Sequence, residues 1–166
     1  MRVEIKDKKD FTEMFNKNYS QNLNTVNGIS IDSRNIEPND LFIPIKGSLV
    51  DGHQFINDVL KIDGTICLNE KTDIENERII KTNSNKEAIM DIALLWRKKI
   101  KSEIIAVTGS NGKTTFKELI YHIIKSQFNC GKSRGNHNST IGLPLTFLSC
   151  KINDKYTILE LGASKA

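Results

Sequence analysis

Residues 104–115 constrain what this chain can fold into more than any other stretch. They read Ile-Ile-Ala-Val-Thr-Gly-Ser-Asn-Gly-Lys-Thr-Thr. The four apolar residues are too short a run for a helix and predict a buried strand, and the glycine turn leads into an amphipathic helical pattern over residues 116–124. A strand, a glycine turn, Lys-Thr and a helix, in this order, are typical of a loop that holds a polyphosphate. In such a loop, backbone N–H groups and the helix N-terminus point at the anion.

The residue types in the turn predict separate roles. Gly109 and Gly112 free the backbone, Lys113 reaches β- and γ-phosphates, and the Thr114 hydroxyl ligates the accompanying Mg²⁺. The longer standard motif has a glycine where Val107 stands, so the motif here is the shorter Thr-Gly-x-x-Gly-Lys-Thr-Thr. The alternative is a turn that uses glycine only for its backbone freedom. Lys-Thr serves no purpose in such a turn, so we favour the phosphate loop.

Two later segments fit the same interpretation. A buried strand is predicted over residues 156–163, with Glu160 near its C-terminal end, where phosphate-loop enzymes place an acidic partner for Mg²⁺. A strand-end surface glutamate is the alternative. The polar, glycine-punctuated loop over residues 131–144 is long for a compact domain, which favours a functional role.

The residues up to about 82 are predicted to form a small α/β unit. Strands are expected over residues 29–34, 41–45, 65–68 and 78–81, and helices over residues 10–16 and 55–62. Pro44 has no N–H to donate, so its strand is placed at a sheet edge or a bulge. Ser33 and Arg34 are at the end of the first of these strands, where they either cap a turn or contact a phosphate or sugar.

A helix over residues 86–100 leads to the phosphate-loop strand, so we expect domains at residues 1–82 and 83–166. The helix after the loop is expected to bury an apolar face of Phe116, Leu119, Ile120, Ile123 and Ile124. From residue 104 onward there are about three strands, whereas a typical sheet has roughly five. We therefore expect partner elements from elsewhere, or an N-terminal part of a longer protein.

Composition excludes several classes of protein. The net charge of +4 over 166 residues is mild and the lysines are scattered, which argues against nucleic acid as a partner. No run approaches the ~20 apolar residues of a membrane span, and the N-terminus lacks a signal-peptide core. Three cysteines without C-x-x-C spacing imply neither a zinc site nor disulfides. We expect a soluble, cytoplasmic protein without membrane insertion.

Several motifs together resemble the Mur ligases, the ATP-dependent amide-forming enzymes of peptidoglycan precursor synthesis. Besides residues 108–115, they are Asp32-Ser-Arg34, Asp40-Leu-Phe42, Asp51-Gly-His-Gln-Phe55, Lys117-Glu118, Gly135-Asn-His-Asn138, Ile141-Gly-Leu-Pro-Leu-Thr146 and Glu160-Leu-Gly-Ala163. Within the family, Ser110 and the Gly-Ala-Ser of residues 162–164 favour the branch that adds D-Ala-D-Ala to UDP-MurNAc-tripeptide. Ser139 and Thr140 depart from the pattern of that branch.

The resemblance implies a small N-terminal α/β domain that binds the UDP substrate, followed by the first part of a P-loop ATPase-type α/β domain. It implies ATP and Mg²⁺ as cofactors, Lys113 and Glu160 as catalytic residues, and Thr114 and Glu160 as metal ligands. The nucleotide-binding residues it implies are Gly109, Ser110, Asn111, Gly112, Lys113, Thr114, Thr115 and Asn138. Those implied for the UDP-MurNAc-peptide are Ser33, Arg34, Lys46, Gly47, Asp51, Gly52 and His53.

The resemblance also implies an acyl-phosphate mechanism and a full-length monomer. Because the family has further domains, we expect this chain to be an N-terminal part that is inactive alone. A sister Mur ligase that adds the third amino acid remains an alternative. A folylpolyglutamate-type synthetase is disfavoured, since that group has Gly-Lys-Gly-Ser at residues 112–115. A non-catalytic nucleotide- or UDP-sugar-binding module is the alternative from another class.

Overall fold

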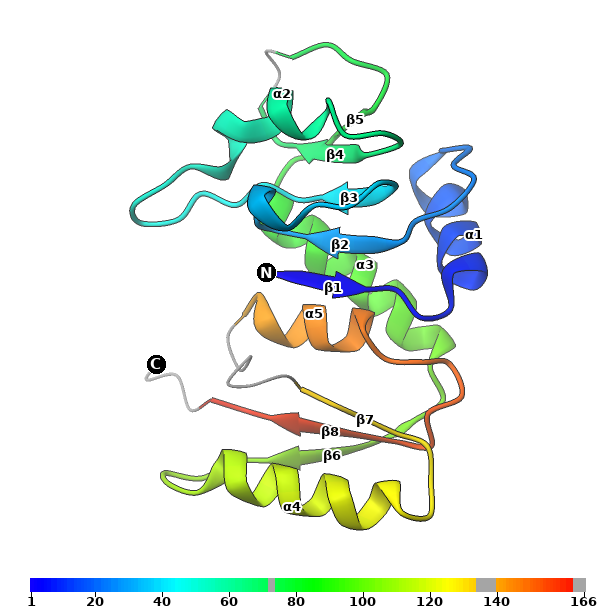
Figure 1. The fold of residues 1–166 in the computed structure, drawn as a ribbon, viewed down its shortest axis with the longest axis vertical. Helices are drawn as coiled ribbons and strands as arrows, with labels where there is room; N and C mark the ends of the chain where they lie inside the picture. Colours follow the sequence, from blue (N-terminus) through cyan, green and yellow to red (C-terminus); the bar gives the residue numbers. More distant parts are fainter. Residues whose placement is uncertain (72–73, 134–139, 163–166) are drawn as a thin grey trace. The chain divides into compact units, whose positions relative to one another are not determined.

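The computed structural model describes residues 1–71, 74–133 and 140–162 (Figure 1). The chain divides into two compact units, Met1–Ile92 and Ala93–Ala166. Each unit has its own β-sheet with helices packed on it, which confirms the predicted α/β class. The boundary between the units falls within the helix α3 (Asn85–Lys99). The domain limits at residues 82 and 83 stay a prediction.

The first unit is built on a five-stranded sheet in which each strand pairs with the next one along the chain. The order is β1 (Arg2–Glu4), β2 (Gly28–Ser30), β3 (Asp40–Phe42), β4 (Ile66–Asn69) and β5 (Ile79–Lys81). Only the β1–β2 pair is antiparallel. The carboxyl ends of β2 to β5 therefore lie along one edge, and the loops that follow them gather there.

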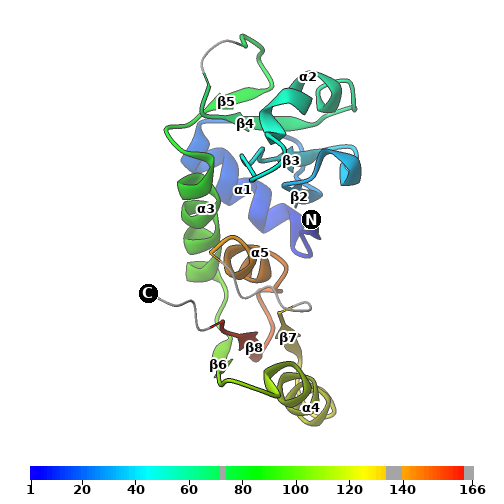
Figure 2. The ribbon, with the colours of Figure 1, turned by 90° about the vertical axis from the view of Figure 1, so that its left-hand side faces the viewer.

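Helices cover both faces of this sheet (Figure 2). The helix α1 (Lys8–Tyr19) and the first turns of α3 lie on one face, and the short α2 (Ile56–Val59) lies on the other. On the α2 side, Phe42 and Cys67 of the strands pack against Ile56, Val59 and Leu60. Phe11 and Phe15 are the buried aromatic residues of α1, with ring centroids 6.3 Å apart. Apolar residues recur at every second position in the strands and every three to four positions in the helices, so each element has an apolar face, and these faces pack together.

One prediction for this unit was wrong, and one strand was missed. The Pro44 strand is not at an edge: β3 pairs with both β2 and β4 and ends at Phe42, so Pro44 lies beyond the ladder and its missing N–H costs no strand pairing. The strand β1 was not predicted, because charged residues flank its one buried apolar residue, Val3. Arg2 is held by two hydrogen bonds to the Asp40 carboxylate, at 2.6 and 2.9 Å.

The second unit has a parallel three-stranded sheet with the last strand in its centre. The order is β6 (Glu103–Val107), β8 (Tyr156–Glu160) and β7 (Cys130–Lys132). The helices α4 (Lys113–Lys125) and α5 (Gly142–Leu148) lie on opposite faces of it (Figures 1 and 2). Ile158 and Leu159 of β8 are buried, as are Leu145 and Leu148 of α5. The segment predicted as a loop over residues 131–144 thus begins with the end of β7 and ends in α5.

The predicted buried face of α4 was largely wrong. Phe116, Leu119 and Ile123 are 55%, 56% and 61% exposed, whereas Lys117 is the buried residue of this helix. The cause is the small sheet: three strands cover one side of α4, and the apolar stripe lies on another side. The strand β6 is likewise exposed at Glu103, Ile104 and Ala106, and β8 is its one partner among the described strands.

Two further predictions concern the whole chain: the lack of a membrane span and of disulfides. Among the described residues, no helix combines the length and apolar character needed to cross a membrane. Cys67, Cys130 and Cys150, all in the described part of the chain, are free thiols. Burial raises the pKa of the Cys67 and Cys150 thiols to about 12.

Candidate functional site

The turn after β6 has the backbone geometry that its glycines predict. Gly109 has a φ of 143° and Gly112 a φ of 72°, values that side-chain-bearing residues rarely adopt. Gly112 is the N-cap of α4, and its carbonyl accepts a hydrogen bond from the Phe116 N–H at 2.9 Å. Ser110 and Asn111, between the two glycines, are exposed. The N-terminal N–H groups of α4 thus adjoin an open glycine turn, the arrangement that binds phosphate.

Lys113 folds back over this turn. Its ammonium donates a hydrogen bond to the Gly109 carbonyl at 2.7 Å and lies 3.5 Å from the Ser110 carbonyl. The carbonyl oxygens hold the cation where it can neutralise charge on an anion seated in the turn. Because a charge-assisted bond to a phosphate oxygen is stronger than one to a neutral carbonyl, Lys113 can exchange one partner for the other.

Glu160 lies beside the turn because β8 pairs with β6. The register sets Glu160 opposite Val107, the last residue of β6 before the turn. The Thr114 hydroxyl donates a hydrogen bond to Glu160 Oε2 at 2.8 Å, and the buried Glu160 is fixed at its backbone, where its N–H donates to Ser133 Oγ at 3.0 Å. The sequence expectation that Glu160 ends a strand adjacent to the loop is therefore met.

The pair of Thr114 and Glu160 fits a magnesium ion chemically. A hydroxyl and a carboxylate are hard oxygen donors, and Mg²⁺ on a nucleotide takes one or two protein ligands, with phosphates and waters completing its shell. In the part of the chain that the structure describes, no cluster of three or more His, Cys, Asp or Glu side chains could hold a metal. Thr115 is exposed in the first turn of α4, and Asn138 lies outside the described residues.

Sequence reasoning missed Lys117 as a member of this site. Its ammonium lies 3.4 Å from Glu160 Oε2 and 3.7 Å from Glu118 Oε1. Glu118 in turn pairs with Lys132, and that hydrogen bond lowers the pKa of the Glu118 carboxyl. The available signal was helical spacing, since Lys117 stands three residues after Thr114 on the same face of α4.

In the first unit, a cavity of about 540 Å³ brings together four of the seven residues predicted for the UDP substrate. These are Ser33, Arg34, Gly47 and Gly52. The rest of its lining is mostly apolar and was not predicted: Met1, Ile31, Asp32, Phe42, Ile45, Val50 and Phe55. An apolar pocket with a few polar groups at its mouth is the usual form of a small-molecule site.

The polar groups at this cavity come from a short turn after β2. Asp32 caps the 3-10 turn Ser33–Asn35, because its carboxylate accepts the Arg34 N–H at 3.2 Å. The same carboxylate pairs with the Arg34 guanidinium at 2.8 Å, which lowers the pKa of the Asp32 carboxyl. The Arg34 side chain is 85% exposed, but its Nε and Nη2 already donate to the Asp32 carboxylate at 2.9 and 2.8 Å. Its other N–H groups are the ones that remain open to an anion.

Asp51 and His53 line a separate hollow of about 360 Å³. His53 is buried, its Nδ1 lies 2.6 Å from Asp51 Oδ1, and its Nε2 lies 3.2 Å from Asn85 Nδ2. Asp51 also accepts a hydrogen bond from Lys71, and this contact followed by the bond from His53 lowers the pKa of the Asp51 carboxyl. These contacts anchor the 3-10 turn Gly52–Phe55, which carries Gly52 into the larger cavity.

The loop that joins these residues is tightly closed. Lys46 and Asp51 form an isolated antiparallel bridge, and the Gly47 N–H donates to the Val50 carbonyl at 2.9 Å. A Cβ atom at Gly52 would meet the backbone N and O of Ile45 at 3.0 Å, so this position requires glycine for close approach. Lys46 thus shapes the loop through its backbone.

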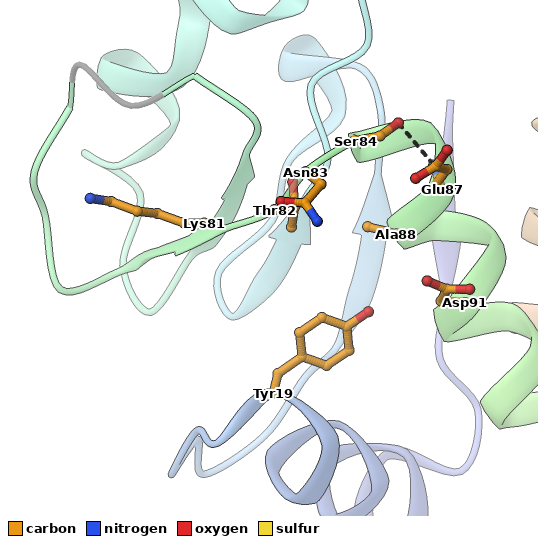
Figure 3. A pocket seen from close by; sticks show the side chains of 8 residues that line it. All are labelled: Tyr19, Lys81, Thr82, Asn83, Ser84, Glu87, Ala88 and Asp91. Carbon is orange, nitrogen blue, oxygen red and sulfur yellow. Dashed lines mark hydrogen bonds between the residues drawn. The ribbon is translucent and has the colours of Figure 1, made fainter.

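A third hollow, of about 410 Å³, contains none of the predicted site residues (Figure 3). Figure 3 shows the Tyr19 hydroxyl turned toward α3 and the Lys81 ammonium pointing away from it. At the start of α3, Ser84 Oγ accepts a hydrogen bond from the Glu87 N–H at 3.3 Å. Burial, followed by the nearby Asp91 carboxylate, raises the pKa of Tyr19 to about 12.

The fold and the first of these sites define a phosphate-loop α/β protein. Comparison with known families narrows this class. The model of the Mur ligase family, catalytic domain, matches residues 25–97, and that of the Mur ligase middle domain matches residues 107–166. The chain belongs to the Mur ligase family.

Individual relatives agree on one branch. UDP-N-acetylmuramoyl-tripeptide–D-alanyl-D-alanine ligase of Bacillus subtilis is 34% identical over 152 residues, covering 90% of this chain and 33% of that protein. The enzyme of the same name from Escherichia coli is 31% identical over 142 residues, covering 84% of this chain and 31% of that protein.

Solved structures give the same result. The MurF ligase of Thermotoga maritima in complex with ADP has a TM-score of 0.76 at 30% identity, over 82% of this chain and 32% of that one. A MurF structure from Acinetobacter baumannii has a TM-score of 0.80 at 25% identity, over 98% and 36%. The chain therefore spans about a third of the length of the proteins it matches.

Proposed function

We propose that this chain provides the substrate-binding and nucleotide-binding start of an ATP-dependent ligase that joins D-Ala-D-Ala to UDP-MurNAc-tripeptide. The observation that carries the proposal is the Thr114–Glu160 hydrogen bond of 2.8 Å beside the glycine turn. It joins the two oxygen donors of a nucleotide-bound Mg²⁺. The names of the relatives support the substrates, and the ADP in the Thermotoga maritima neighbour supports the nucleotide.

Each unit has a part in this proposal. Residues 1–82 bind the UDP substrate, with Arg34 donating two hydrogen bonds to the diphosphate and the apolar cavity receiving the rest of the UDP end. Residues 83–166 open the ATP-binding domain, where the turn around Gly109 and Gly112 receives the nucleotide phosphates. The protein acts on small molecules in the cytoplasm, as a monomer at full length, without nucleic acid or membrane insertion.

The reaction that this site serves passes through an acyl phosphate. The substrate carboxylate attacks the γ-phosphorus of ATP and ADP leaves; the amine of D-Ala-D-Ala then attacks the acyl carbon, and phosphate leaves from the tetrahedral intermediate. Lys113 neutralises charge on the transferring group, and Thr114 and Glu160 would hold a Mg²⁺ ion, which would supply further positive charge there. The protein groups act by position and charge and form no covalent bond with the substrate.

A crossed binding experiment tests both halves of the proposal. Isothermal titration of the unsubstituted chain should show binding of Mg²⁺–ADP and, separately, of UDP-MurNAc-tripeptide. Lys113→Ala should weaken ADP binding by about ten- to a hundredfold, because a charge-assisted contact is lost, and leave the UDP ligand unaffected. Arg34→Ala should give the reverse pattern.

Each half can fail by itself. If UDP-MurNAc-tripeptide does not bind while ADP does, the assignment of residues 1–82 is wrong. If ADP does not bind, the phosphate loop lacks its proposed role in this chain. Equal losses of both ligands in both variants would indicate unfolding, which circular dichroism of the variants detects.

A further inference from the structure

The helix α4 buries Lys117 and exposes the apolar residues Phe116, Leu119 and Ile123, which is the reverse of the usual pattern. Lys117 has a side chain that is 0% exposed, whereas Phe116 next to it is 55% exposed. An ammonium removed from water is strongly unfavourable unless it is paired and hydrogen-bonded. Packing alone would favour phenylalanine over lysine at the buried position.

The contacts of Lys117 account for its burial. Its ammonium lies 3.4 Å from Oε2 of Glu160, whose side chain is 3% exposed, and this oxygen also accepts the Thr114 hydroxyl at 2.8 Å. Glu118 Oε1 lies 3.7 Å from the same ammonium. Lys117 and Thr114 thus approach one carboxylate oxygen from successive turns of a single helix.

The placement of Glu160 makes this pairing relevant to the phosphate loop. Its backbone is fixed by the register with Val107 and by the bond to Ser133, so the remaining freedom lies in its side-chain torsions. Two contacts to Oε2 restrict those torsions. A carboxylate already fixed in one orientation loses less conformational freedom when it binds a cation. The Lys117 ammonium also balances the charge of the buried carboxylate before a metal ion binds.

We propose that Lys117 is a positioning residue for the metal–nucleotide site: its buried ammonium holds the Glu160 carboxylate in the orientation that receives Mg²⁺. The inference rests on the proposed nucleotide function and adds to it a residue that does not touch the nucleotide. Lys113 and Lys117 stand four residues apart in one helix, and the inference gives them different roles. The first acts on the phosphates and the second on the carboxylate that serves the metal.

The test measures the magnesium dependence of ADP binding in Lys117→Met, which keeps much of the side-chain volume and removes the charge. We expect ADP affinity with Mg²⁺ to fall about tenfold and ADP affinity in EDTA to stay unchanged. Lys117→Arg, which keeps the cation, should recover part of the loss. Lys125→Met, which removes a cation from the exposed end of the same helix, should bind like the unsubstituted chain.

A stability cycle that needs no nucleotide accompanies the titration. Lys117→Met should destabilise the fold by leaving Glu160 with an uncompensated charge, and Lys117→Met/Glu160→Gln should recover much of that loss in urea unfolding. If Lys117→Met does not fold, Lys117→Arg and the double variant still provide the comparison. No recovery in the double variant would overturn the pairing.

The remaining outcomes separate the two proposals. Equal weakening of ADP binding with and without Mg²⁺ in Lys117→Met, or no weakening, would overturn the positioning role while the nucleotide site stands. Absence of ADP binding to the unsubstituted chain would overturn the nucleotide function, and the positioning role with it. The urea cycle would then still decide whether Lys117 and Glu160 form a pair.

Discussion

At the scale of single residues, Gly52 and Gly112 show two different needs for glycine. At Gly52 the backbone of Ile45 is so close that a Cβ would meet it at 3.0 Å. At Gly112 a Cβ would meet nothing within 4 Å, and the need is the φ of 72°. The first glycine lets a loop close against the backbone of Ile45, and the second turns the chain into α4 with open space in front of the helix.

Local motifs made several site residues predictable, and tertiary pairing hid others. Lys113 and Thr114 follow a glycine turn within a few residues, so their roles could be proposed from spacing. Helical spacing sets Lys117 on the same side of its helix as Thr114, but its partner Glu160 is distant in the sequence and meets it only through the pairing of β8 with β6, so its role could not be assigned. The apolar lining of the cavity of about 540 Å³, such as Val50 and Phe55, was missed because these residues come together only in the folded unit.

Tyr19 carries a pH prediction at this scale. Its pKa is raised to about 12 from 10.0, so the folded chain holds the phenolic proton more tightly than the unfolded chain. The free energy of unfolding should therefore be unaffected by this group below about pH 10 and should fall between about pH 10 and 12, by about 1–2 kcal/mol after allowance for partial exposure.

Urea unfolding at stepped alkaline pH, with tyrosinate absorbance as a second readout, checks this. Tyr19→Phe should remove the decline that this group causes. Asp91→Asn should reduce it only slightly, because burial is the larger cause of the shift. A Tyr19→Phe variant with the same alkaline decline as the unsubstituted chain would contradict the prediction.

At the scale of elements, α4 shows where periodicity is informative and where it is insufficient. The pattern over residues 116–124 correctly predicted a helix, but the side it buries depends on the sheet against which it packs. Three strands cover the Lys117 side and leave Phe116, Leu119 and Ile123 exposed. Pro44 is a parallel case, since its effect on β3 depended on where the strand ends.

The exposed stripe of α4 gives the prediction for this scale. In the 166-residue chain, Leu119→Gln and Ile123→Gln should change the free energy of unfolding by no more than about 0.5 kcal/mol, because both side chains are mostly in water. Ile158→Ala, in the fully buried centre of β8, should cost about 2–4 kcal/mol.

Urea unfolding provides both numbers, and sedimentation velocity adds a second readout. The double variant Leu119→Gln/Ile123→Gln should reduce self-association at high concentration, since it breaks a contiguous apolar patch. Destabilisation of either single variant to the level of Ile158→Ala would show that this face is buried in solution.

At the scale of the whole molecule, the α/β class, the presence of most strands and the family followed from the sequence, because they depend on short apolar runs and local motifs. The position of β8 between β6 and β7 did not, since strand order within a sheet is set by long-range packing. The chain spans about a third of the length of the relatives it matches, and this length limits the activity that can be expected of it.

We expect the 166 residues by themselves to lack ligase activity. The chain spans about a third of the length of the ligases it matches, so most of such a protein lies outside these residues. A coupled assay of ADP release and mass spectrometry of the peptide product, with ATP and both substrates, checks this. The full-length Escherichia coli relative serves as positive control, and amide product from the 166-residue chain would contradict the expectation.

The order of the two sheets has a consequence for synthesis on the ribosome. In the five-stranded sheet each strand pairs with the one made just before it, so pairing can proceed as the chain emerges. In the three-stranded sheet β6 and β7 flank a gap that β8 fills, and β8 is made after both. The glycine turn and α4 thus leave the ribosome before the strand that brings Glu160 to them, and the nascent chain passes through a stage at which its phosphate loop exists without its acidic partner.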